Sequence, residues 1–370
     1  MKIALIDTVK KPKFYPVALL KLGAWRRELG DDCSLHNTIL PEWADEIWIT
    51  TVFTFDIPYS MAIIKEAKKR CNRVRVGGIA ATLLPDYFSE LGVDVHCGLH
   101  PEAEKFSPDY SLLGDFPGYS ITHTSRGCVR KCSFCMVKDV EPKFYTRPTW
   151  ENDVFPDSSK IIFYDNNWSA KPLIVMQEDA DKIKSLRQSH GVHHIDFNQS
   201  MDCRILTPEK INLISTLPFS PIRFAFDSIK ESDPLQKVLW QLSEKRRFKV
   251  SIDMLYNFEE HPREIYKRME TIITLRDQLN WGSIDLFPMM YRPIKQVASD
   301  GHVGRRWTAK TLSAFRQILS LSSMRGTVSV HTEEEFRFWY GKDENEFVAL
   351  LNYPKLLSLL RSKKGSRRNK

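Results

Sequence analysis

TSRGCVRKCSFCMV, residues 124–137, carries the most specific pattern in the chain, because three cysteines fall within eight positions directly after a predicted strand. Cys128, Cys132 and Cys135 are spaced Cys-x3-Cys-x2-Cys. Three thiolates from one loop can converge on a metal centre, whereas three sulfurs cannot pair completely as disulfides. At this cysteine content, chance produces the spacing in roughly one chain of four hundred. The pattern therefore predicts a metal site.

The kind of metal follows from how many ligands the chain offers. A structural zinc site is closed by four protein ligands, usually as two pairs, and the other cysteines (Cys33, Cys71, Cys97 and Cys203) are isolated from one another. An iron–sulfur cluster ordinarily takes four thiolates, so three from one loop favour a cluster with one iron open to another ligand. His123 is close in sequence, but its place in a strand favours packing over metal binding.

With Phe134 before its last cysteine, the array resembles the signature of the radical S-adenosylmethionine (SAM) superfamily. The resemblance implies a [4Fe–4S] cluster on Cys128, Cys132 and Cys135, with SAM bound to the fourth iron. It implies that an electron from the cluster cleaves the sulfonium C–S bond, giving methionine and a 5′-deoxyadenosyl radical that abstracts a substrate hydrogen. A reductant such as flavodoxin or ferredoxin is implied as a partner.

The pattern around the array predicts an α/β fold with parallel sheets. We expect an N-terminal Rossmann-like sheet, a Pro- and Gly-rich linker, a partial (β/α)6 barrel, a helical C-terminal region and a basic disordered tail. Their predicted bounds are residues 1–105, 106–118, 119–305, 306–360 and 361–370. The six barrel strands are predicted at residues 120–124, 160–164, 194–198, 222–227, 249–254 and 283–287.

The basic balance of the chain comes from its tail. The net charge is +8, but the last ten residues, RSKKGSRRNK, hold six Lys and Arg and no acidic residue, which leaves a body of net charge +2. The tail is predicted to make at most a weak contact with nucleic acid or an acidic partner. The chain has no run of about eighteen apolar residues and no signal-peptide pattern, so a cytoplasmic protein without membrane contact is expected.

The resemblance assigns further residues to the cofactor. Asp165 and Asn166, which follow the second barrel strand, are expected at the methionine end of SAM, although the usual Gly-Gly-Glu of the family is absent. Gln199 and Arg204, after the third strand, are expected to face the site. The planar guanidinium of Arg204 suits the SAM carboxylate, and a surface salt bridge is the alternative.

Polar residues at the later strand ends are the candidates for contacts with ribose or substrate. Asp227 ends the fourth strand and Asp253 lies in the fifth, where their carboxylates would face the barrel mouth. A helix-capping role is the alternative for Asp227. Tyr291 and Arg292 follow the sixth strand and, with Asp253, are the candidate catalytic residues. No local pattern shows whether the substrate is a small molecule, a peptide or RNA.

Residues 76–106 resemble the last third of the cobalamin-binding domain that precedes many radical SAM barrels. Gly77 and Gly78 would then let the backbone approach the corrin tail. The Asp-x-His-x-x-Gly motif that supplies an axial His in some cobalamin proteins is missing, since Thr-Val follows Asp7. Only about ten residues separate the second and third strands, too few for a crossover helix. The domain is expected to be trimmed on one side, and to bind cobalamin or be retained without it.

These observations predict a radical SAM enzyme. With cobalamin, the resemblance favours methyl transfer to an unactivated carbon, which would make the enzyme a transferase. Without cobalamin, a rearrangement or another radical modification is open. The alternatives from other classes are a nucleic-acid-binding protein and an electron carrier, each with a structural metal site.

Overall fold

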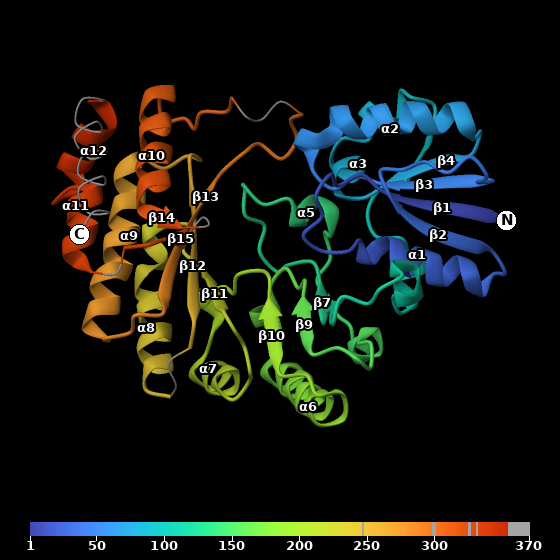
Figure 1. The fold of residues 1–370 in the computed structure, drawn as a ribbon. Coiled ribbons are helices and arrows are strands. Elements are labelled where there is room, and N and C mark those ends of the chain that lie inside the picture. Colours follow the sequence, from blue (N-terminus) through green and yellow to red (C-terminus); the bar gives the residue numbers. More distant parts are fainter. Residues whose placement is uncertain (246–247, 298–300, 325–326, 331, 354–370) are drawn as a thin grey trace, which may run out of the picture. The chain divides into compact units, whose positions relative to one another are not determined.

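The computed structural model describes residues 1–245, 248–297, 301–324, 327–330 and 332–353 (Figure 1). The chain forms two compact units. Unit 1 comprises Met1–Asn166, Lys184–His193 and Pro293–Gly301, and unit 2 comprises Asn167–Ile183, His194–Arg292 and His302–Lys370. This is a division by compactness, and the domain bounds expected from the sequence stay predictions. The expected basic tail, residues 361–370, lies outside the described residues.

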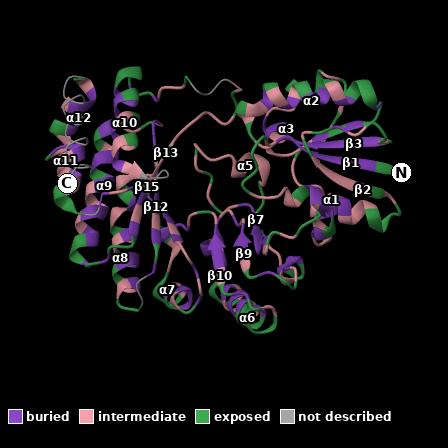
Figure 2. Cartoon of the chain, in the orientation of Figure 1, coloured by how far each residue is buried: buried purple, intermediate pink, exposed green. Residues whose placement is uncertain are grey.

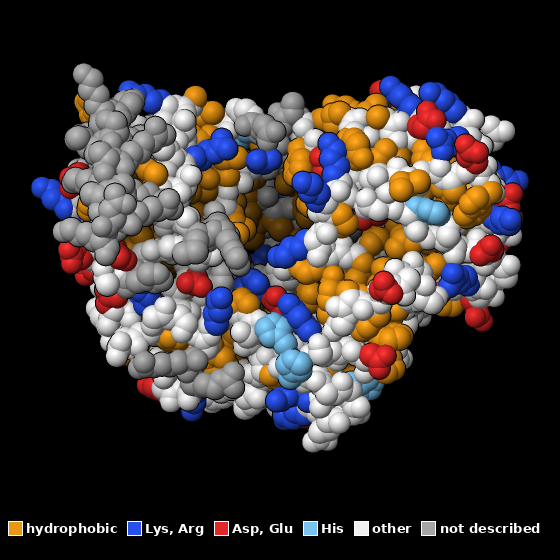
Figure 3. All heavy atoms as spheres, viewed as in Figure 1, with side chains coloured by type: hydrophobic (Ala, Val, Ile, Leu, Met, Phe, Trp, Pro, Cys, Tyr) orange, Lys and Arg blue, Asp and Glu red, His pale blue; other side chains and the backbone are white. Residues whose placement is uncertain are grey.

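Burial and charge are distributed as the composition leads one to expect. Figure 2 shows the strands largely buried, while the helices present exposed residues on their outer sides. On the face drawn in Figure 3, basic and acidic side chains are interspersed rather than gathered by sign. Within the described residues, no helix combines the length and apolarity that crossing a membrane would need.

Unit 1 begins with a five-stranded sheet in the order β2-β1-β3-β4-β5, in which all neighbouring strands are parallel. Its strands are β1 (Lys2–Asp7), β2 (Asp32–Asn37), β3 (Glu46–Thr50), β4 (Val74–Gly77) and β5 (Asp94–Val95). Its helices are α1 (Val17–Glu28), α2 (Ile57–Arg70), α3 (Ile79–Leu83) and α4 (Asp86–Ser89). The Rossmann-like parallel sheet is thereby confirmed.

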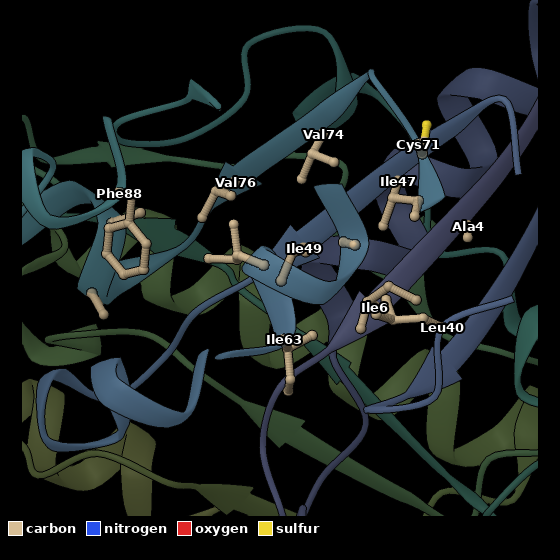
Figure 4. Close-up of a cluster of buried hydrophobic side chains, with 14 of the residues drawn as sticks. Ala4, Ile6, Leu40, Ile47, Ile49, Ile63, Cys71, Val74, Val76 and Phe88 are labelled. Carbon is tan, nitrogen blue, oxygen red and sulfur yellow. The ribbon is translucent and has the colours of Figure 1, made fainter. Parts of the chain in front are cut away.

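Alternate residues of β1 serve opposite faces of this sheet. Ala4 and Ile6 pack with residues of α2 and α3, as Figure 4 shows from the side of that core. Ile3 and Leu5 pack in a second core that includes Leu19 of α1. In Figure 1, α1 and α2 lie on opposite sides of the sheet. Helices thus cover both faces, which parallel strands with two apolar faces require.

Residues 38–45 connect β2 to β3 without a helix, as the short spacing predicts. Since β2 and β3 lie on either side of β1, the chain reverses the direction of strand addition here. In open parallel sheets, ligands bind outside the carboxyl ends of the strands at such a switch point. The β1–β3 boundary is therefore the expected ligand-binding edge of this domain.

The first two barrel strands belong to unit 1. β6 (Tyr119–Thr122) and β9 (Lys160–Phe163) pair in parallel, and β7 (Ser125–Arg126) pairs with β8 (Tyr145–Thr146) in antiparallel fashion. α5 (Val137–Val140) follows the cysteine array. Short 3₁₀ turns complete this part: η1 (Thr54–Asp56), η2 (Ala103–Lys105), η3 (Tyr110–Leu113) and η4 (Trp150–Asp153).

Buried polar contacts join α1 and its preceding loop to β6. The Tyr15 hydroxyl accepts from the Ile121 N–H at 2.7 Å. The Lys21 ammonium, 1% exposed, lies 3.1 Å from Asp153, which also receives Arg147 at 2.9 Å. Because one carboxylate faces two cations inside the protein, its charge is well compensated. These contacts tie the N-terminal sheet to the first barrel strand.

Unit 2 holds the other four barrel strands and the helical C-terminal region. β11, β12 and β13 pair in parallel, and β15 and β14 continue the sheet in antiparallel fashion. The strands are β10 (His194–Phe197), β11 (Ile222–Ala225), β12 (Val250–Tyr256), β13 (Ile284–Met290), β14 (Ser323–Met324) and β15 (Thr327–Val328). Three short 3₁₀ turns are η5 (Trp168–Ala170), η6 (Cys203–Ile205) and η7 (Ile229–Glu231).

The helices from residue 173 onward are α6 (Leu173–His190), α7 (Pro208–Ser215), α8 (Ser232–Ser243), α9 (Pro262–Gln278), α10 (Ala309–Ser322), α11 (Glu333–Tyr340) and α12 (Glu344–Asn352). Phe347 of α12 packs on Tyr266 of α9 and Phe315 of α10, with ring centroids 5.3 and 5.8 Å apart. The six barrel strands and the C-terminal helices confirm the predicted fold class within the described residues.

Candidate metal and cofactor site

The three predicted metal ligands lie on one loop, residues 127–143, which leaves β7 and returns to β8 and is called the Cys loop here. Cys128, Cys132 and Cys135 are each partly exposed, as is Phe134. The antiparallel pairing of β7 with β8 closes the base of the loop. A short two-stranded ladder thus brings both ends of the Cys loop together.

Gly127 is required at the entrance of the Cys loop. Its φ is +71°, and a Cβ at this position would lie 2.2 Å from the backbone oxygen of Lys143. No other residue type fits there without moving the returning strand. The Gly127 N–H also donates to Glu141 Oε2 at 2.7 Å. The two ends of the loop are therefore held by backbone contact and by a carboxylate.

Glu141 and Arg126 form a buried charge cluster at the same place. Arg126, 6% exposed, donates to both oxygens of Glu104 at 2.7 and 2.9 Å and to Glu141 Oε1 at 3.0 Å. Asn166 donates to Glu141 Oε2 at 2.8 Å. Arg126, Gly127 and Asn166 therefore each donate a hydrogen bond to a carboxylate oxygen of Glu141. No local sequence pattern predicts this cluster, because its charged pairs join residues 15 or more positions apart.

Two further contacts within the Cys loop involve the cysteines themselves. The Arg130 N–H lies 3.3 Å from Cys128 Sγ, and the Lys138 ammonium donates to the Cys132 carbonyl at 3.1 Å. Burial raises the pKa of the Cys135 thiol. A raised pKa disfavours the free thiolate, so a metal ion binding at Cys135 would have to displace the thiol proton. All seven cysteines are thiols without a disulfide.

Within the described part of the chain, no three His, Cys, Asp or Glu side chains lie close enough to hold one metal ion together. Ligands of a single zinc ion sit about 2.0–2.3 Å from the metal and so crowd around one point. Thiolates of a [4Fe–4S] cluster bind separate irons and need wider spacing. The assignment of the three cysteines to a cluster stays a prediction.

Asp165 binds the residues that lead into the Cys loop. It is 1% exposed, and its Oδ2 accepts from the Thr124 N–H at 2.8 Å. Its Oδ1 accepts from the hydroxyls of Thr124 and Ser125, both at 2.6 Å. Asp165 and Asn166 were predicted to contact SAM, and the structure places both at the base of the Cys loop. Their contact with the cofactor stays a prediction.

The predicted Gly-Gly turn lies at the carboxyl end of β4. Gly78 has a φ of +103°, and a Cβ there would lie 2.4 Å from the Thr51 carbonyl oxygen. A Cβ on Gly77 would make only ordinary contact, 3.6 Å from the His96 carbonyl oxygen. The close approach at Gly78 is thus to the chain's own backbone. Packing explains that glycine, and its predicted contact with a corrin stays untested.

The polar side chains at the β1–β3 switch point bind one another. The Thr8 hydroxyl donates to the Thr50 carbonyl at 2.8 Å, and the Ser60 hydroxyl donates to Thr8 Oγ1 at 3.0 Å. Asp7, 3% exposed, accepts from the Val9 N–H at 3.0 Å, and burial raises its pKa. No imidazole follows Asp7, so the ligand of the Asp-x-His-x-x-Gly motif is absent from this position. Since α3 packs on α5, this edge of the sheet neighbours the Cys loop.

Unit 2 carries the other predicted residues. Arg204 donates through Nε and Nη2 to the two oxygens of Asp202 at 2.7 and 3.1 Å, and its Nη1 lies 2.7 Å from Glu231. The salt bridge that was the alternative for Arg204 is thus present. Gln199 is exposed, after the end of β10.

Two predicted carboxylates belong to neighbouring strands: Asp227 follows β11, and Asp253 lies within β12. Asp227 Oδ1 accepts from the Leu255 N–H at 2.9 Å, and burial raises the pKa of Asp227 to about 6. Asp253, 9% exposed, accepts from the Ser200 hydroxyl, and burial raises its pKa. The following turn is capped by Ser228, so Asp227 does not serve as the cap.

Arg268 fixes the two strand ends that carry these carboxylates. It is fully buried and donates to the carbonyls of Phe226 and Leu255 at 2.6 and 2.7 Å. Phe226 precedes Asp227 in the chain, and Leu255 donates the backbone hydrogen bond to Asp227. Arg268 escaped the sequence analysis, because a basic residue on an amphipathic helix is usually exposed.

Tyr291 lies beyond β13 in an aromatic group. Its ring meets Phe258 and His302 edge-on, with centroids 4.6 and 5.5 Å apart. Asn257 donates to the Tyr291 carbonyl at 3.3 Å. Arg292, the next predicted residue, is partly exposed. His302 is a neighbour of Tyr291 that the sequence could not reveal.

Comparison with known proteins identifies the fold. No protein-family model matches the chain, and no curated protein matches its sequence. The radical SAM methyltransferase TsrM from Kitasatospora setae, solved with cobalamin and a [4Fe–4S] cluster, matches with a TM-score of 0.60 at 11% identity, over 88% of this chain and 79% of that chain. TsrM solved with its tryptophan substrate and the SAM analogue aza-SAM matches with a TM-score of 0.59 at 11% identity, over 87% and 77%.

At this identity the likeness shows a shared fold. Since it covers 88% of the chain, it extends beyond either predicted domain alone. The radical SAM fold with a cobalamin-domain-like N-terminal part, predicted from the sequence, is confirmed. The [4Fe–4S] cluster bound in TsrM is the group that the sequence predicted for this chain, and cobalamin is one of the two outcomes that the sequence left open.

Proposed function

We propose that this chain is a radical SAM enzyme that holds a [4Fe–4S] cluster on Cys128, Cys132 and Cys135 and cleaves SAM reductively. The observation that carries the proposal is the Cys loop. It presents three thiols after the start of the predicted barrel, in a fold shared with TsrM. Thiolates are the ligands that iron–sulfur clusters use, and three of them leave one iron for a further ligand.

Held by Cys128, Cys132 and Cys135, such a cluster would supply the electron for reductive cleavage of SAM to methionine and a 5′-deoxyadenosyl radical. The chain's own part is to hold the loop in shape. Glu141 joins its two ends through Gly127 and Arg126, and Asp165 fixes the strand that leads into it. These contacts would hold the base of the loop in place for the three thiols.

Polar groups at the strand ends of unit 2 are our candidates for contacts with SAM or substrate. Asp253 is a buried carboxylate and Asp227 a half-buried one, both have raised pKa values, and such groups concentrate at functional sites. Asp227 is held by Leu255 through one oxygen, and a ribose hydroxyl suits the other. We assign Tyr291 and Arg292 to the substrate, because they follow directly on β13.

Cobalamin-dependent methyl transfer is a second candidate. The likeness to TsrM favours it, because the cobalamin-bound structure matches over most of this chain. The residues at the carboxyl edge of the N-terminal sheet give it no support of their own. Gly78 is needed by the backbone of Thr51, and the hydroxyls of Thr8 and Ser60 are bound within the chain. The donor groups therefore do not fit cobalamin by themselves.

The test is anaerobic reconstitution with iron and sulfide, followed by SAM and dithionite. We expect 5′-deoxyadenosine from the wild-type chain and none from Cys132→Ala. The matched control, Cys97→Ala, removes an exposed thiol outside the Cys loop and should retain the product. An electron carrier or a nucleic-acid-binding protein would give no product at all. If the protein, separated from unbound cobalamin after incubation, shows no corrin absorption band, the second candidate is refuted.

A further inference from the structure

The 3₁₀ turn η2, which carries Glu104, is capped by an imidazole. The residue before the turn, Glu102, makes no side-chain hydrogen bond to it. The Ala103 N–H donates instead to Nδ1 of the His100 ring at 3.3 Å. The Glu104 N–H donates to the His100 carbonyl at 3.0 Å. His100 thus accepts from two consecutive N–H groups at the start of the turn, as a capping residue does.

The ring of His100 packs among other rings of the N-terminal sheet. Its centroid lies 4.6 Å from that of Trp25 in α1 and 6.3 Å from that of Trp48 in β3. The ring of His96, which follows β5, is 4.9 Å away. Close packing on these rings restricts rotation of the His100 side chain and keeps Nδ1 at the turn.

Glu104 connects this turn to the Cys loop. Its two carboxylate oxygens accept from Arg126 Nη2 at 2.7 and 2.9 Å, and Oε2 also accepts from Arg126 Nε at 3.2 Å. Arg126 directly precedes Gly127, the residue at the entrance of the loop. Since the Glu104 backbone is held by His100, a displacement of η2 moves the carboxylate that holds Arg126.

We propose that His100 is a positioning residue of the Cys loop, whose neutral ring caps η2 so that Glu104 holds Arg126. The inference rests on the proposed function, since the order of the loop serves the chemistry only if the cysteines hold a cluster. An imidazole nitrogen accepts a hydrogen bond only while it carries no proton. Protonation at Nδ1 would replace the acceptor by a donor facing the Ala103 N–H, and the cap would be lost.

The surroundings of His100 keep its ring neutral. Burial lowers the pKa of His100, the charges of His96 and of Arg75 in β4 lower it further, and Glu102, which is paired with Lys105, acts in the opposite direction. The other charged groups on the packed elements are Arg26 over the two Trp rings, Glu46 bound to Trp48, and Glu104. Because the unfolded chain binds this proton more tightly, the capped turn is fully stable above about pH 6.5 and loses stability as the pH falls below that value.

Hydrogen–deuterium exchange of the full chain tests this without a cluster. His100→Phe keeps a ring against Trp25 but has no acceptor, so protection of the Gly127 amide should fall about fivefold at pH 7.5. His100→Asn restores an acceptor close to the place of Nδ1, and Asn is a good capping residue, so its protection at pH 7.5 should equal that of the wild type. At pH 5.0 the wild type should lose protection and His100→Asn should keep more of it, because the Asn amide does not titrate.

The matched control is His36→Asn, which removes another imidazole of the sheet whose pKa burial also lowers. His36 is bound to Ser34 within β2, so this control should keep the wild-type dependence on pH. Wild-type protection of Gly127 in His100→Phe, or the same pH dependence in the wild type and His100→Asn, would overturn the proposal. An equal loss of protection in α2 would also overturn it, because the whole unit would then be destabilised.

The reconstituted chain gives a second readout. Release of iron to a chelator at pH 7.5 should be faster from His100→Phe than from the wild type or His100→Asn, and equal rates from the three proteins would contradict the proposal. If the wild-type chain takes up no iron, the proposed function fails, while the exchange measurement still decides the role of His100.

Discussion

Replacing Glu141 by Gln should loosen the Cys loop by a predictable amount. Glu141 accepts on both oxygens, from Arg126 on Oε1 and from Gly127 and Asn166 on Oε2. A Gln side chain has the same shape, but its amide group carries two donors at one end. Whichever way the Gln amide is turned, its NH2 group faces N–H donors of the protein and cannot accept hydrogen bonds from them. The variant therefore loses acceptor contacts and the charge that balances Arg126.

The magnitude follows from burial. Hydrogen bonds to charged groups are worth about 1.5–3 kcal/mol, and breaking a buried ion pair costs about 3–5 kcal/mol. Arg126 keeps its bidentate pair with Glu104, so we place the loss at about 2–3 kcal/mol of local stability. Since about 1.4 kcal/mol is tenfold in an equilibrium constant, the amide of Gly127 should exchange about 30- to 150-fold faster.

Hydrogen–deuterium exchange of a peptide spanning the base of the Cys loop measures this directly. The matched control is Glu102→Gln, whose partner Lys105 is 2.9 Å away in an exposed pair. Exposed pairs contribute little, so the control should exchange like the wild type. If Glu141→Gln also exchanges within threefold of the wild type, Glu141 does not hold the loop and the reasoning is refuted.

Three further outcomes are expected. Gly127→Ala should prevent cluster incorporation, because its Cβ would collide with the Lys143 backbone; a normal iron content after reconstitution would contradict this. Burial raises the pKa of Asp227 to about 6, so the native state binds its proton more tightly than the unfolded state, and this residue lowers stability as the pH rises from about 4 to 6. Asp227→Asn should therefore gain stability over the wild type more at pH 7.5 than at pH 4.5, and equal differences in urea midpoints would refute this. Asp153→Asn should destabilise the protein by about 3–5 kcal/mol, because it removes the carboxylate that both Lys21 and Arg147 contact. Lys21→Met removes only one of these cations and should destabilise the protein by about 1–2 kcal/mol. Urea unfolding with the reverse ranking would contradict the assignment.

Local pattern accounts for what the sequence predicted well. Helix α9, Pro262–Gln278, follows from local pattern, because Pro262 begins it and its apolar residues recur at helical spacing. The strands expected at residues 160–164 and 194–198 end one residue earlier in the structure. The cysteine array needed only short spacing to be noticed.

The rest depended on residues far apart in the chain. Asp165 was correctly placed after a strand, but its bonds to Thr124 and Ser125 span about 40 residues and no spacing rule predicts them. The same holds for Glu104, which reaches Arg126 from the predicted N-terminal domain. Sequence reasoning thus located the loop and missed the side chains that hold it.

The most direct test of the central claim is the metal content and electron paramagnetic resonance of the anaerobically reconstituted chain. We expect about four irons and four sulfides per chain, and a reduced-cluster signal that changes when SAM is added. Bound zinc in place of iron, or a signal indifferent to SAM, would contradict it.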